Sequence, residues 1–205
     1  MPISTPDLIA SRREEIMNAC EKLYQTMSFS DITLKEIGSE TSFTRTSIYN
    51  YFSTKEEIFL ALLKREYDLW TGDLRSIRDI RPELPADGFA RRIADSFEKR
   101  VFMLKLLAMD LYDIEESTSL EKLTDFKISY KAAIDTLGEA LAVHFPYTDE
   151  RERQEFIYAL LPFMFGVYPY AFATEKQKKA MDSAGLRYPE YSVSEIIFDF
   201  LNRIL

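Results

Sequence analysis

Hydroxyl, amide and guanidinium side chains gather at residues 44–50, where they can donate hydrogen bonds to phosphates and to the edges of bases. No acidic residue occurs from position 41 to position 54, although the whole chain has a formal net charge of −8. Arg45 can bind a guanine with two hydrogen bonds or hold a phosphate, whereas Thr46 and Ser47 are small enough to allow close approach. The pattern predicts a surface for nucleic acid, formed by Thr44, Arg45, Thr46, Ser47, Tyr49 and Asn50.

Two further residues extend this predicted surface. Lys55 stands at the start of a long helical pattern, where the helix dipole and the free amide groups favour an anion. Thr33 occupies the start of a preceding short helix, with Glu36 three residues later as its partner in a capping box. Helix ends and isolated lysines are common in proteins, so both positions also fit a purely structural role.

Catalytic chemistry has few residues to build on. The chain contains one His and one Cys, and no nucleophile–base pair, phosphate loop or metal cluster is visible. We therefore predict no enzyme, no catalytic residue, no metal site and no cofactor. The lone Cys20 leaves no intramolecular disulfide, which favours a cytoplasmic setting. No signal-peptide pattern opens the chain, and the longest apolar run, 159–173, is too short for a membrane span, so we expect no membrane partner.

Apolar residues recur at helical spacing along nearly the whole chain, and no convincing strand alternation is found, which predicts an all-α fold. The Pro-rich segment 81–85 and the segment 185–189 are expected to interrupt the helices, and 175–183 is expected to be a short polar segment. Helices are expected at about 5–27, 33–40, 44–52, 56–80, 87–99, 100–112, 119–144, 146–172 and 192–205.

Two short helices separated by three residues, with a longer helix before and after them, are typical of a helix-turn-helix. In that motif the second helix lies in the DNA major groove, and its N-terminal residues meet the base edges. Phe43, Ile48 and Phe52 can pack inward and leave the polar residues of 44–50 outside. The short helix 44–52 is thus predicted to be the recognition helix, although its residues are middling helix formers.

Residues from about 12 to 63 resemble the DNA-binding domain of the TetR/AcrR family of bacterial transcription regulators. The most specific part of the resemblance is the pattern Ser/Thr-x-x-x-Leu/Ile-Tyr-x-x-Phe-x-x-Lys, matched by Thr44, Ile48, Tyr49, Phe52 and Lys55. The resemblance implies a homodimer whose N-terminal three-helix domain, 1–55, contains the helix-turn-helix. It also implies a larger helical C-terminal domain, 56–205, of the tetracyclin-repressor-like type, for dimerisation and effector binding.

The resemblance also implies roles for single residues. Tyr49 and Lys55 match positions that hold the DNA backbone, and the contact face of the recognition helix is matched by Thr44, Arg45 and Ser47. The family frequently has glycine at three positions where this chain has Ser28, Ser42 and Thr46. The last of these changes what the DNA groove meets, so the sequence preference of relatives cannot be transferred.

Together these features predict a sequence-specific DNA-binding regulator, a repressor that binds a double-stranded operator. It is expected to respond to an unknown small effector of hydrophobic or aromatic character. Charge opposes strong DNA binding, because residues 1–55 carry six basic and seven acidic side chains whereas DNA-binding modules are usually basic. An alternative is a TetR-like protein that does not bind DNA and acts through a protein partner.

The segment 155–172 is apolar on nearly all sides, which indicates a helix covered by more than its own neighbours or a wholly central one. Together with the apolar stripe of 192–205 it can form an isologous four-helix interface between two copies. A monomeric core helix is the alternative. The predicted interface comprises Phe156, Leu160, Val193, Ile197, Phe200, Leu201 and Ile204.

Aromatic and Met side chains supply an adaptable apolar surface that can line a ligand cavity, with Pro162 and Pro169 distorting a helix to open it. Aromatic stripes also fit an ordinary core. His144 is expected at a helix C-terminus, where a cation suits the dipole. The predicted effector pocket comprises Phe97, Phe102, Met103, Met109, Tyr112, Phe126, Tyr130, Phe163 and Tyr168.

Overall fold

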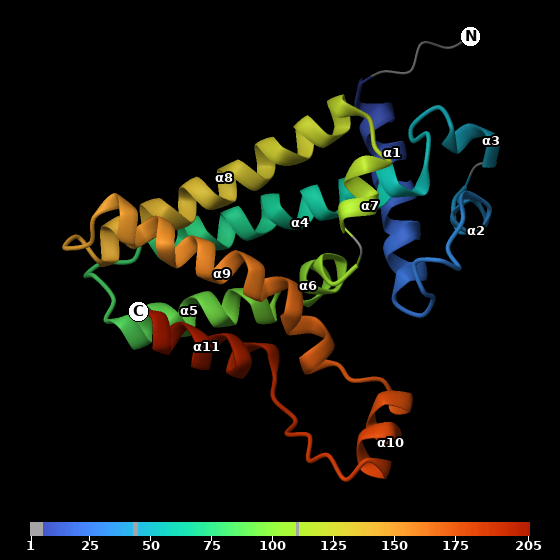
Figure 1. Ribbon diagram of the computed structural model, residues 1–205. Helices are drawn as coiled ribbons and strands as arrows, with labels where there is room; N and C mark the ends of the chain where they lie inside the picture. Colours follow the sequence, from blue (N-terminus) through green and yellow to red (C-terminus); the bar gives the residue numbers. More distant parts are fainter. Residues whose placement is uncertain (1–5, 43–44, 110) are drawn as a thin grey trace. The chain divides into compact units, whose positions relative to one another are not determined.

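The computed structural model describes residues 6–42, 45–109 and 111–205, which form helices joined by turns and loops (Figure 1). No β-strand occurs within these ranges, and the predicted all-α fold is confirmed. The helices in chain order are α1 (Pro6–Tyr24), α2 (Leu34–Ser39), α3 (Arg45–Ile48), α4 (Lys55–Arg78), α5 (Ala86–Glu98), α6 (Val101–Leu107), α7 (Leu111–Glu116), α8 (Leu120–His144), α9 (Glu150–Ala171), α10 (Glu175–Ser183) and α11 (Val193–Ile204).

The contacts within the chain divide it into two compact units. Unit 1 comprises residues 1–65 and 109–128, and unit 2 comprises residues 66–108 and 129–205. Helices α4 and α8 each begin in unit 1 and end in unit 2. The contacts divide the chain after Arg65, whereas the domain boundary expected from the resemblance follows Lys55, and that boundary stays a prediction.

Two expectations about the helices are corrected. The helix expected at 100–112 is divided into α6 and α7, and the break between them lies where the chain passes from unit 2 to unit 1. The polar segment expected at 175–183 is itself a helix, α10. Its start is stabilised by a reciprocal capping box between Thr174 and Gln177, which the pattern of apolar residues does not reveal.

The core of unit 1 is built on the inner face of α1. Cys20 is fully buried there, and Tyr24 meets the ring of Phe59 from α4 edge to face, with the ring centroids 5.1 Å apart. Burial raises the pKa of the Cys20 thiol to about 12. Cys20 is therefore a core residue of unit 1, as expected, in surroundings that disfavour the thiolate. At the surface, Arg65 of α4 pairs with Glu14 of α1 at 3.1 Å.

The core of unit 2 surrounds Trp70, the only tryptophan of the chain. The indole Nε1 donates a hydrogen bond to the hydroxyl oxygen of Ser96 at 3.1 Å, and the ring centroid of Phe97 lies 4.8 Å from that of Trp70. Tyr67 of α4 and Tyr130 of α8 join these two helices through rings 5.3 Å apart. The buried indole N–H of Trp70 thus has a hydrogen-bond acceptor, as the N–H of a buried tryptophan usually does.

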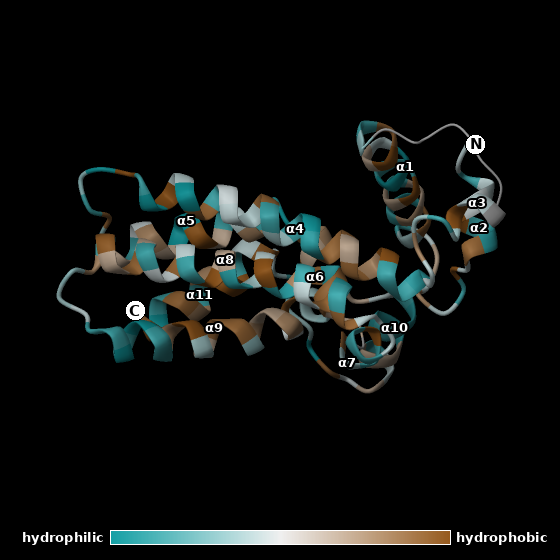
Figure 2. Ribbon diagram, turned by 90° about the horizontal axis from the view of Figure 1, so that it is seen from above, coloured by the Kyte–Doolittle hydropathy of each residue, from teal (hydrophilic) through white to brown (hydrophobic). Residues whose placement is uncertain are grey.

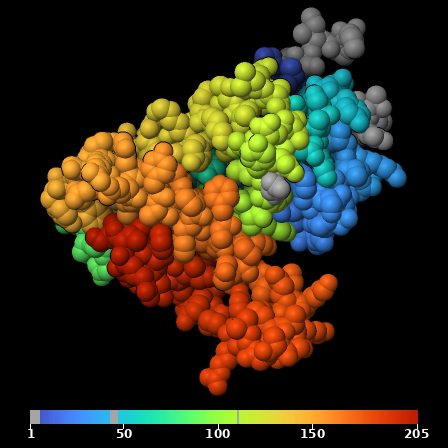
Figure 3. Space-filling model, in the orientation of Figure 1, coloured from blue at the N-terminus to red at the C-terminus, as the bar shows by residue number. Residues whose placement is uncertain are grey.

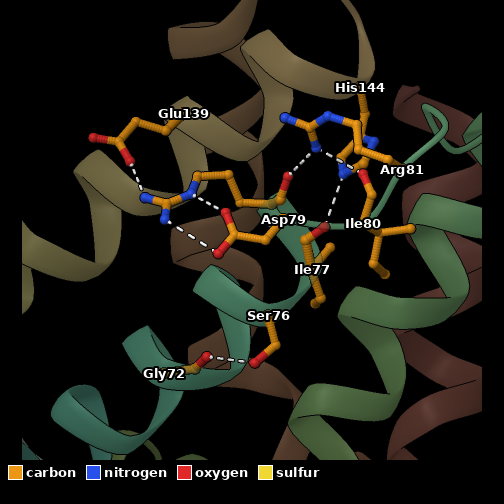
Figure 4. A network of polar contacts seen from close by, with 9 residues as sticks. Gly72, Ser76, Ile77, Asp79, Ile80, Arg81, Glu139 and His144 are labelled. Carbon is orange, nitrogen blue, oxygen red and sulfur yellow. Dashed lines mark hydrogen bonds and ion pairs between the residues drawn. The ribbon is translucent and has the colours of Figure 1, made fainter.

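The end of α4 is tied to α8 by polar contacts (Figure 4). Arg78 donates to the carboxylate of Glu139 at 2.6 Å, and the Nε2 atom of buried His144 lies 2.9 Å from the carbonyl oxygen of Ile77. The Leu84 N–H donates to Nδ1 of His144 at 3.1 Å. The two ring nitrogens of His144 therefore both have a backbone partner. His144 thus lies at the C-terminal end of α8, as expected, and its buried ring joins α8 to the end of α4 and to the loop between α4 and α5.

Candidate nucleic-acid interface

The α3 segment, residues 45–52, begins with a helix of only four residues. Turn geometry continues beyond it, and the Phe52 N–H donates to the carbonyl oxygen of Ile48 at 3.0 Å. Regular helix therefore covers only the first part of the expected 44–52 helix. Ile48 and Phe52 are fully buried, as predicted, whereas Phe43 lies outside the described residues. Two apolar side chains thus anchor the segment to the core of unit 1.

Polar side chains of the α3 segment face away from this anchor. Tyr49 is 48% exposed and Asn50 is exposed, whereas Ser47 is half-buried. Thr44 and the side chains of Arg45 and Thr46 lie outside the described residues. The division into a buried pair and an outer polar surface agrees with the geometry of a helix-turn-helix. The contact of each of these residues with DNA stays a prediction.

Helix α1 holds the chain on both sides of this segment. Before it, Arg12 donates from Nη1 to the hydroxyl oxygen of Ser42 at 2.8 Å, and the Glu15 carboxylate accepts from the Ser42 N–H at 2.6 Å. At its far end, Arg13 donates from Nη1 to the carbonyl oxygen of Tyr51 at 2.8 Å. A segment with one helical turn is too short to be stable alone, so these attachments set its position.

Sequence reasoning missed these three α1 residues. One signal was present, because Arg12 and Glu15 have the spacing of a helical ion pair, which the structure shows at 3.1 Å. The backbone N–H and the hydroxyl of Ser42 hold the pKa of the Glu15 carboxyl below its ordinary value, and Arg12 adds to this effect. The carboxylate is therefore charged at neutral pH and keeps the turn before α3 attached to α1.

Lys55, the first residue of α4, is held at the helix N-terminus. Its Nζ donates to the carbonyl oxygen of Phe29 at 2.8 Å and lies 4.2 Å from the centroid of the Phe29 ring. An ammonium group has three N–H donors, so this attachment orients the group without using its full hydrogen-bonding capacity. The predicted phosphate contact would thus start from an oriented cation.

Thr33 is exposed and is the N-cap of α2. Its hydroxyl oxygen accepts from the Lys35 N–H at 3.2 Å, and the same hydroxyl binds the carboxylate of Glu36. The expected capping box is corrected, because the hydroxyl caps the N–H of the second helical residue and contacts the side chain of the third. The N-terminus of α2 nevertheless presents a hydroxyl group at the surface of unit 1.

The residues predicted to line an effector pocket fall into both units. Met109, Tyr112 and Phe126 belong to unit 1, and the other six belong to unit 2. Tyr112 is 74% exposed, so its ring lies at the surface of its unit. Full burial is found at Phe97, Met103 and Phe126, and partial burial at Phe102, Met109, Tyr130, Phe163 and Tyr168. The assignment of these residues to an effector stays a prediction.

Most of the predicted dimer-interface residues are buried within their own chain, where α11 packs against α5 and α9. A side chain that its own subunit covers adds no area to a contact with a second copy. Five residues are buried in this way, Phe156, Leu160, Val193, Ile197 and Leu201, and their part in an interface stays a prediction. The half-buried Phe200 and Ile204 stay predicted interface residues.

The exposed side of α9 carries a different apolar stripe. Tyr158, Pro162, Phe165 and Pro169 are exposed, and their spacing of four, three and four residues places them on one side of the helix. Figure 2 shows how extensively α9 and α11 are hydrophobic. The sequence could not distinguish the two stripes, because a helix that is apolar all round has no polar face to orient it.

No group of three or more His, Cys, Asp or Glu side chains in the described part of the chain is placed to hold a metal ion. No single described helix is long and apolar enough to cross a membrane. The bent pair α9 and α10, with an angle of 80° between them, meets the requirement of length and composition only when the two are taken together.

Family models match nearly the whole chain. "Bacterial regulatory proteins, tetR family" matches residues 16–62, and "Tetracyclin repressor-like, C-terminal domain" matches residues 64–205. The HTH-type transcriptional regulator HbdR from Aromatoleum sp. (strain CIB) is 28% identical over 72 residues, which cover 35% of this chain and 31% of HbdR. Matches to the curated relatives thus span about a third of their length.

Solved structures share the fold along the chain. A transcriptional regulator of the TetR/AcrR family from Thermobifida fusca YX-ER1 has a TM-score of 0.64 at 14% identity, over 95% of this chain and 96% of the other. The TetR family regulator PfmR from Thermus thermophilus has a TM-score of 0.61 at 14% identity, over 94% and 95%. Because the N-terminal and C-terminal family models match in order along 16–205, the chain belongs to the TetR family of bacterial transcription regulators.

Proposed function

We propose that this chain is a homodimeric repressor that binds a double-stranded DNA operator through the α3 segment. The observation that carries the proposal is the attachment of α1 to both sides of this segment, through Ser42 and Tyr51. A surface that reads base edges binds more tightly when it is ordered beforehand, because ordering it during binding costs affinity. Dimerisation and repression are typical of the family, and they support the remainder of the proposal.

The proposed contacts divide according to their chemistry. Phosphates are bound by the hydroxyl group of exposed Tyr49 and by the ammonium group of Lys55, and by Thr33 once its hydroxyl group exchanges the Glu36 carboxylate for a phosphate. Base edges are met by the residues at the start of the α3 segment and by one amide: Thr44, Arg45, Thr46, Ser47 and Asn50. Two copies place their α3 segments in major grooves that lie about 34–36 Å apart, or a multiple of this distance.

Fluorescence anisotropy with DNA from upstream of the chain's own gene tests the proposal, at about 50 mM and about 200 mM salt. Wild-type protein should bind this DNA more tightly than a scrambled sequence, and Arg45→Ala should remove the preference while dimerisation is retained. Arg92→Ala is the matched control, since it removes an exposed cation from α5 in unit 2. Equal binding of both sequences by the wild type would refute the proposal.

A second function is supported by charge. Residues 1–55 contain one more acidic than basic side chain, so few cations are available to neutralise phosphates. This supports a protein of TetR fold that acts through a protein partner and does not bind DNA. The same titration separates the two functions, because the second predicts no sequence preference and no difference between wild type and Arg45→Ala.

We also propose that a small hydrophobic or aromatic effector weakens operator binding. Support comes from the apolar side chains of unit 2 named above, among them buried Phe97 and Met103. A ligand can contact buried side chains only if their neighbours move, and such a rearrangement can change the separation of the two α3 segments. Native mass spectrometry of the purified protein would identify the ligand. Anisotropy with that ligand should then show a higher operator Kd, and an unchanged Kd would contradict effector control.

A further inference from the structure

Arg65 of α4 joins this helix to α1 through three acceptors. Its Nη1 atom donates to the carboxylate of Glu14 at 3.1 Å and to the side-chain oxygen of Asn18 at 2.8 Å. Its Nη2 atom donates to the carboxylate of Glu21. The three acceptors follow one another at spacings of four and three residues, so they lie on one side of α1 over two helical turns. One guanidinium group thus binds a stretch of α1 and not a single point.

These four residues form a cluster within unit 1, which is here called the Arg65 clamp. The side chain of Arg65 is 22% exposed and that of Glu21 is 31% exposed, so water reaches their ion pair only in part. The contacts of a guanidinium group have a defined direction, because its N–H donors are fixed in one plane. Arg65 is also the last residue of α4 that belongs to unit 1. The clamp therefore holds α1 in one orientation against the unit 1 part of α4.

Apolar packing alone leaves the rotation of α1 about its own axis poorly fixed. Cys20 and Tyr24 belong to the buried face of α1, and hydrophobic burial has no preferred direction. Side-chain ends lie about 5–6 Å from a helix axis, so a rotation of about 20° moves them by roughly 2 Å. A shift of this size breaks a hydrogen bond such as that of Arg13 to Tyr51, which is 2.8 Å long. The clamp opposes such a rotation because it binds α1 at three positions.

The same stretch of α1 holds the α3 segment. Figure 3 shows α2 and the α3 segment beside each other at the surface of unit 1, in blue and cyan. Three residues of α1 bind the chain on either side of the α3 segment: Arg12, Arg13 and Glu15. Glu14 of the clamp lies among them in the sequence, and a helix is nearly rigid over one turn. A rotation that carries Glu14 away from Arg65 therefore displaces these attachments as well.

We infer that Arg65 is a positioning residue for the α3 segment, which acts through α1 and not by contact with DNA. The inference rests on the proposed function, because it names a residue that orders the proposed operator-binding surface. Without the clamp α1 stays packed but can turn, and the α3 segment then occupies several positions, of which only one fits the operator. The operator Kd rises in inverse proportion to the fraction of molecules in that position.

Arg65→Met tests the inference by two measurements, because methionine keeps an unbranched apolar side chain but has no N–H donor. The operator Kd from fluorescence anisotropy should rise by about tenfold. Hydrogen exchange of the peptide that contains 45–52, measured by mass spectrometry without DNA, should become at least about fivefold faster. The exchange measurement needs no operator, so it tests the inference separately from the proposed function.

Arg100→Met is the matched control, because it removes a similar ion pair from unit 2. Arg100 pairs with Asp73 of α4 at 3.0 Å, and its side chain is 20% exposed, against 22% for Arg65. The control should be destabilised in urea by a comparable amount, yet keep the wild-type operator Kd and the wild-type exchange rate at 45–52. A protein that is only less stable remains almost wholly folded without denaturant, and short surface segments exchange through local opening.

Two further variants test the same clamp. Arg65→Lys restores the charge but not the planar set of donors, so its operator Kd and its exchange rate should lie between those of the wild type and of Arg65→Met. The double variant Asn18→Ala, Glu21→Gln removes acceptors on α1 and leaves Arg65 in place. It should change both quantities in the same direction as Arg65→Met, and it decides the question if Arg65→Met does not fold.

The outcomes separate the inference from the proposed function. An exchange rate at 45–52 in Arg65→Met and in the double variant equal to that of Arg100→Met would overturn the inference. Faster exchange together with the wild-type operator Kd would also overturn it, because the α3 segment would then bind equally well without the clamp. Faster exchange in a protein whose wild type has no sequence preference for DNA would uphold the clamp as the device that orders the α3 segment and would refute the proposed function.

Discussion

Arg13 of α1 donates a hydrogen bond from Nη1 to the carbonyl oxygen of Tyr51 at a distance of 2.8 Å. The same guanidinium group lies 4.1 Å from the centroid of the buried Phe52 ring. One side chain thus holds the end of the α3 segment through a backbone hydrogen bond and through a cation–π contact. The position of the proposed DNA surface therefore depends on a residue that need not contact DNA.

Replacing Arg13 should weaken this attachment. Arg13→Met keeps an unbranched apolar side chain but loses the hydrogen bond and the cation–π contact, which together contribute about 1–2 kcal/mol. Urea unfolding of this variant should show a free energy of unfolding that is lower by this amount. Anisotropy should show operator binding that is at least about tenfold weaker. Arg13→Lys retains a hydrogen-bond donor, so its unfolding free energy and its operator affinity should lie between those of the wild type and of Arg13→Met. Lower stability with unchanged operator affinity would show that Arg13 has no part in positioning the α3 segment.

The attachment through Ser42 should depend on pH. Because native contacts lower the pKa of Glu15, its contribution to stability is complete above the ordinary carboxyl value of 4.5 and is lost as the pH falls through the lowered native value. Glu15→Gln cannot ionise, so the difference in unfolding free energy between wild type and variant should shrink as the pH is lowered. Urea unfolding at a series of pH values from about 6 to about 3 measures this difference. A difference that stays constant over this range would contradict the role of the Glu15 charge.

Lys55 should contribute to the salt dependence of operator binding. Each phosphate that a protein neutralises adds about 0.9 to the slope of log K against log salt concentration. Lys55→Met, present twice in the dimer, should therefore reduce the magnitude of this slope by up to about 1.8. Anisotropy at four or five salt concentrations gives the slope, with Arg92→Ala as a control of equal charge. An unchanged slope would show that Lys55 neutralises no phosphate and only contacts Phe29.

His144 should stabilise unit 2. His144→Ala leaves the buried carbonyl group of Ile77 and the N–H of Leu84 without their ring partner, and an unsatisfied buried group costs about 1–3 kcal/mol. Thermal unfolding should show that the free energy of unfolding falls by about 2–5 kcal/mol. This range includes the cost of the cavity that the ring leaves behind. His144→Gln, which can still accept and donate, should recover part of it. Equal stability of the alanine variant and the wild type would show that these bonds contribute little.

The sequence predicted elements better than it predicted which surfaces they bury. Ile48 and Phe52 were assigned to the core because polar neighbours in the same short segment distinguish an inner from an outer side. In α9 that contrast is missing, so the sequence did not indicate that Leu160 is buried within the chain whereas Tyr158 and Phe165 are exposed. Periodicity indicates a face only where the opposite face is polar.

Contacts between distant parts of the sequence were beyond such reasoning. Arg13 and Tyr51 are 38 positions apart, and no local pattern joins a guanidinium group to a particular backbone carbonyl. The same holds for His144, whose partner Ile77 is 67 positions away. Local rules placed both residues on helices, but only the packed fold brings them to their acceptors.

Burial of Trp70 has a consequence for measuring the two units separately. The chain has one tryptophan, which lies in unit 2 with its indole bound to Ser96, so intrinsic emission follows the unfolding of unit 2 alone. Circular dichroism follows the helices of both units. Two transitions that coincide in one titration would indicate cooperative unfolding, and transitions that separate would give each unit its own midpoint. The emission of the indole in unit 2 would then reveal whether a variant of unit 1, such as Arg13→Met, also changes the stability of unit 2.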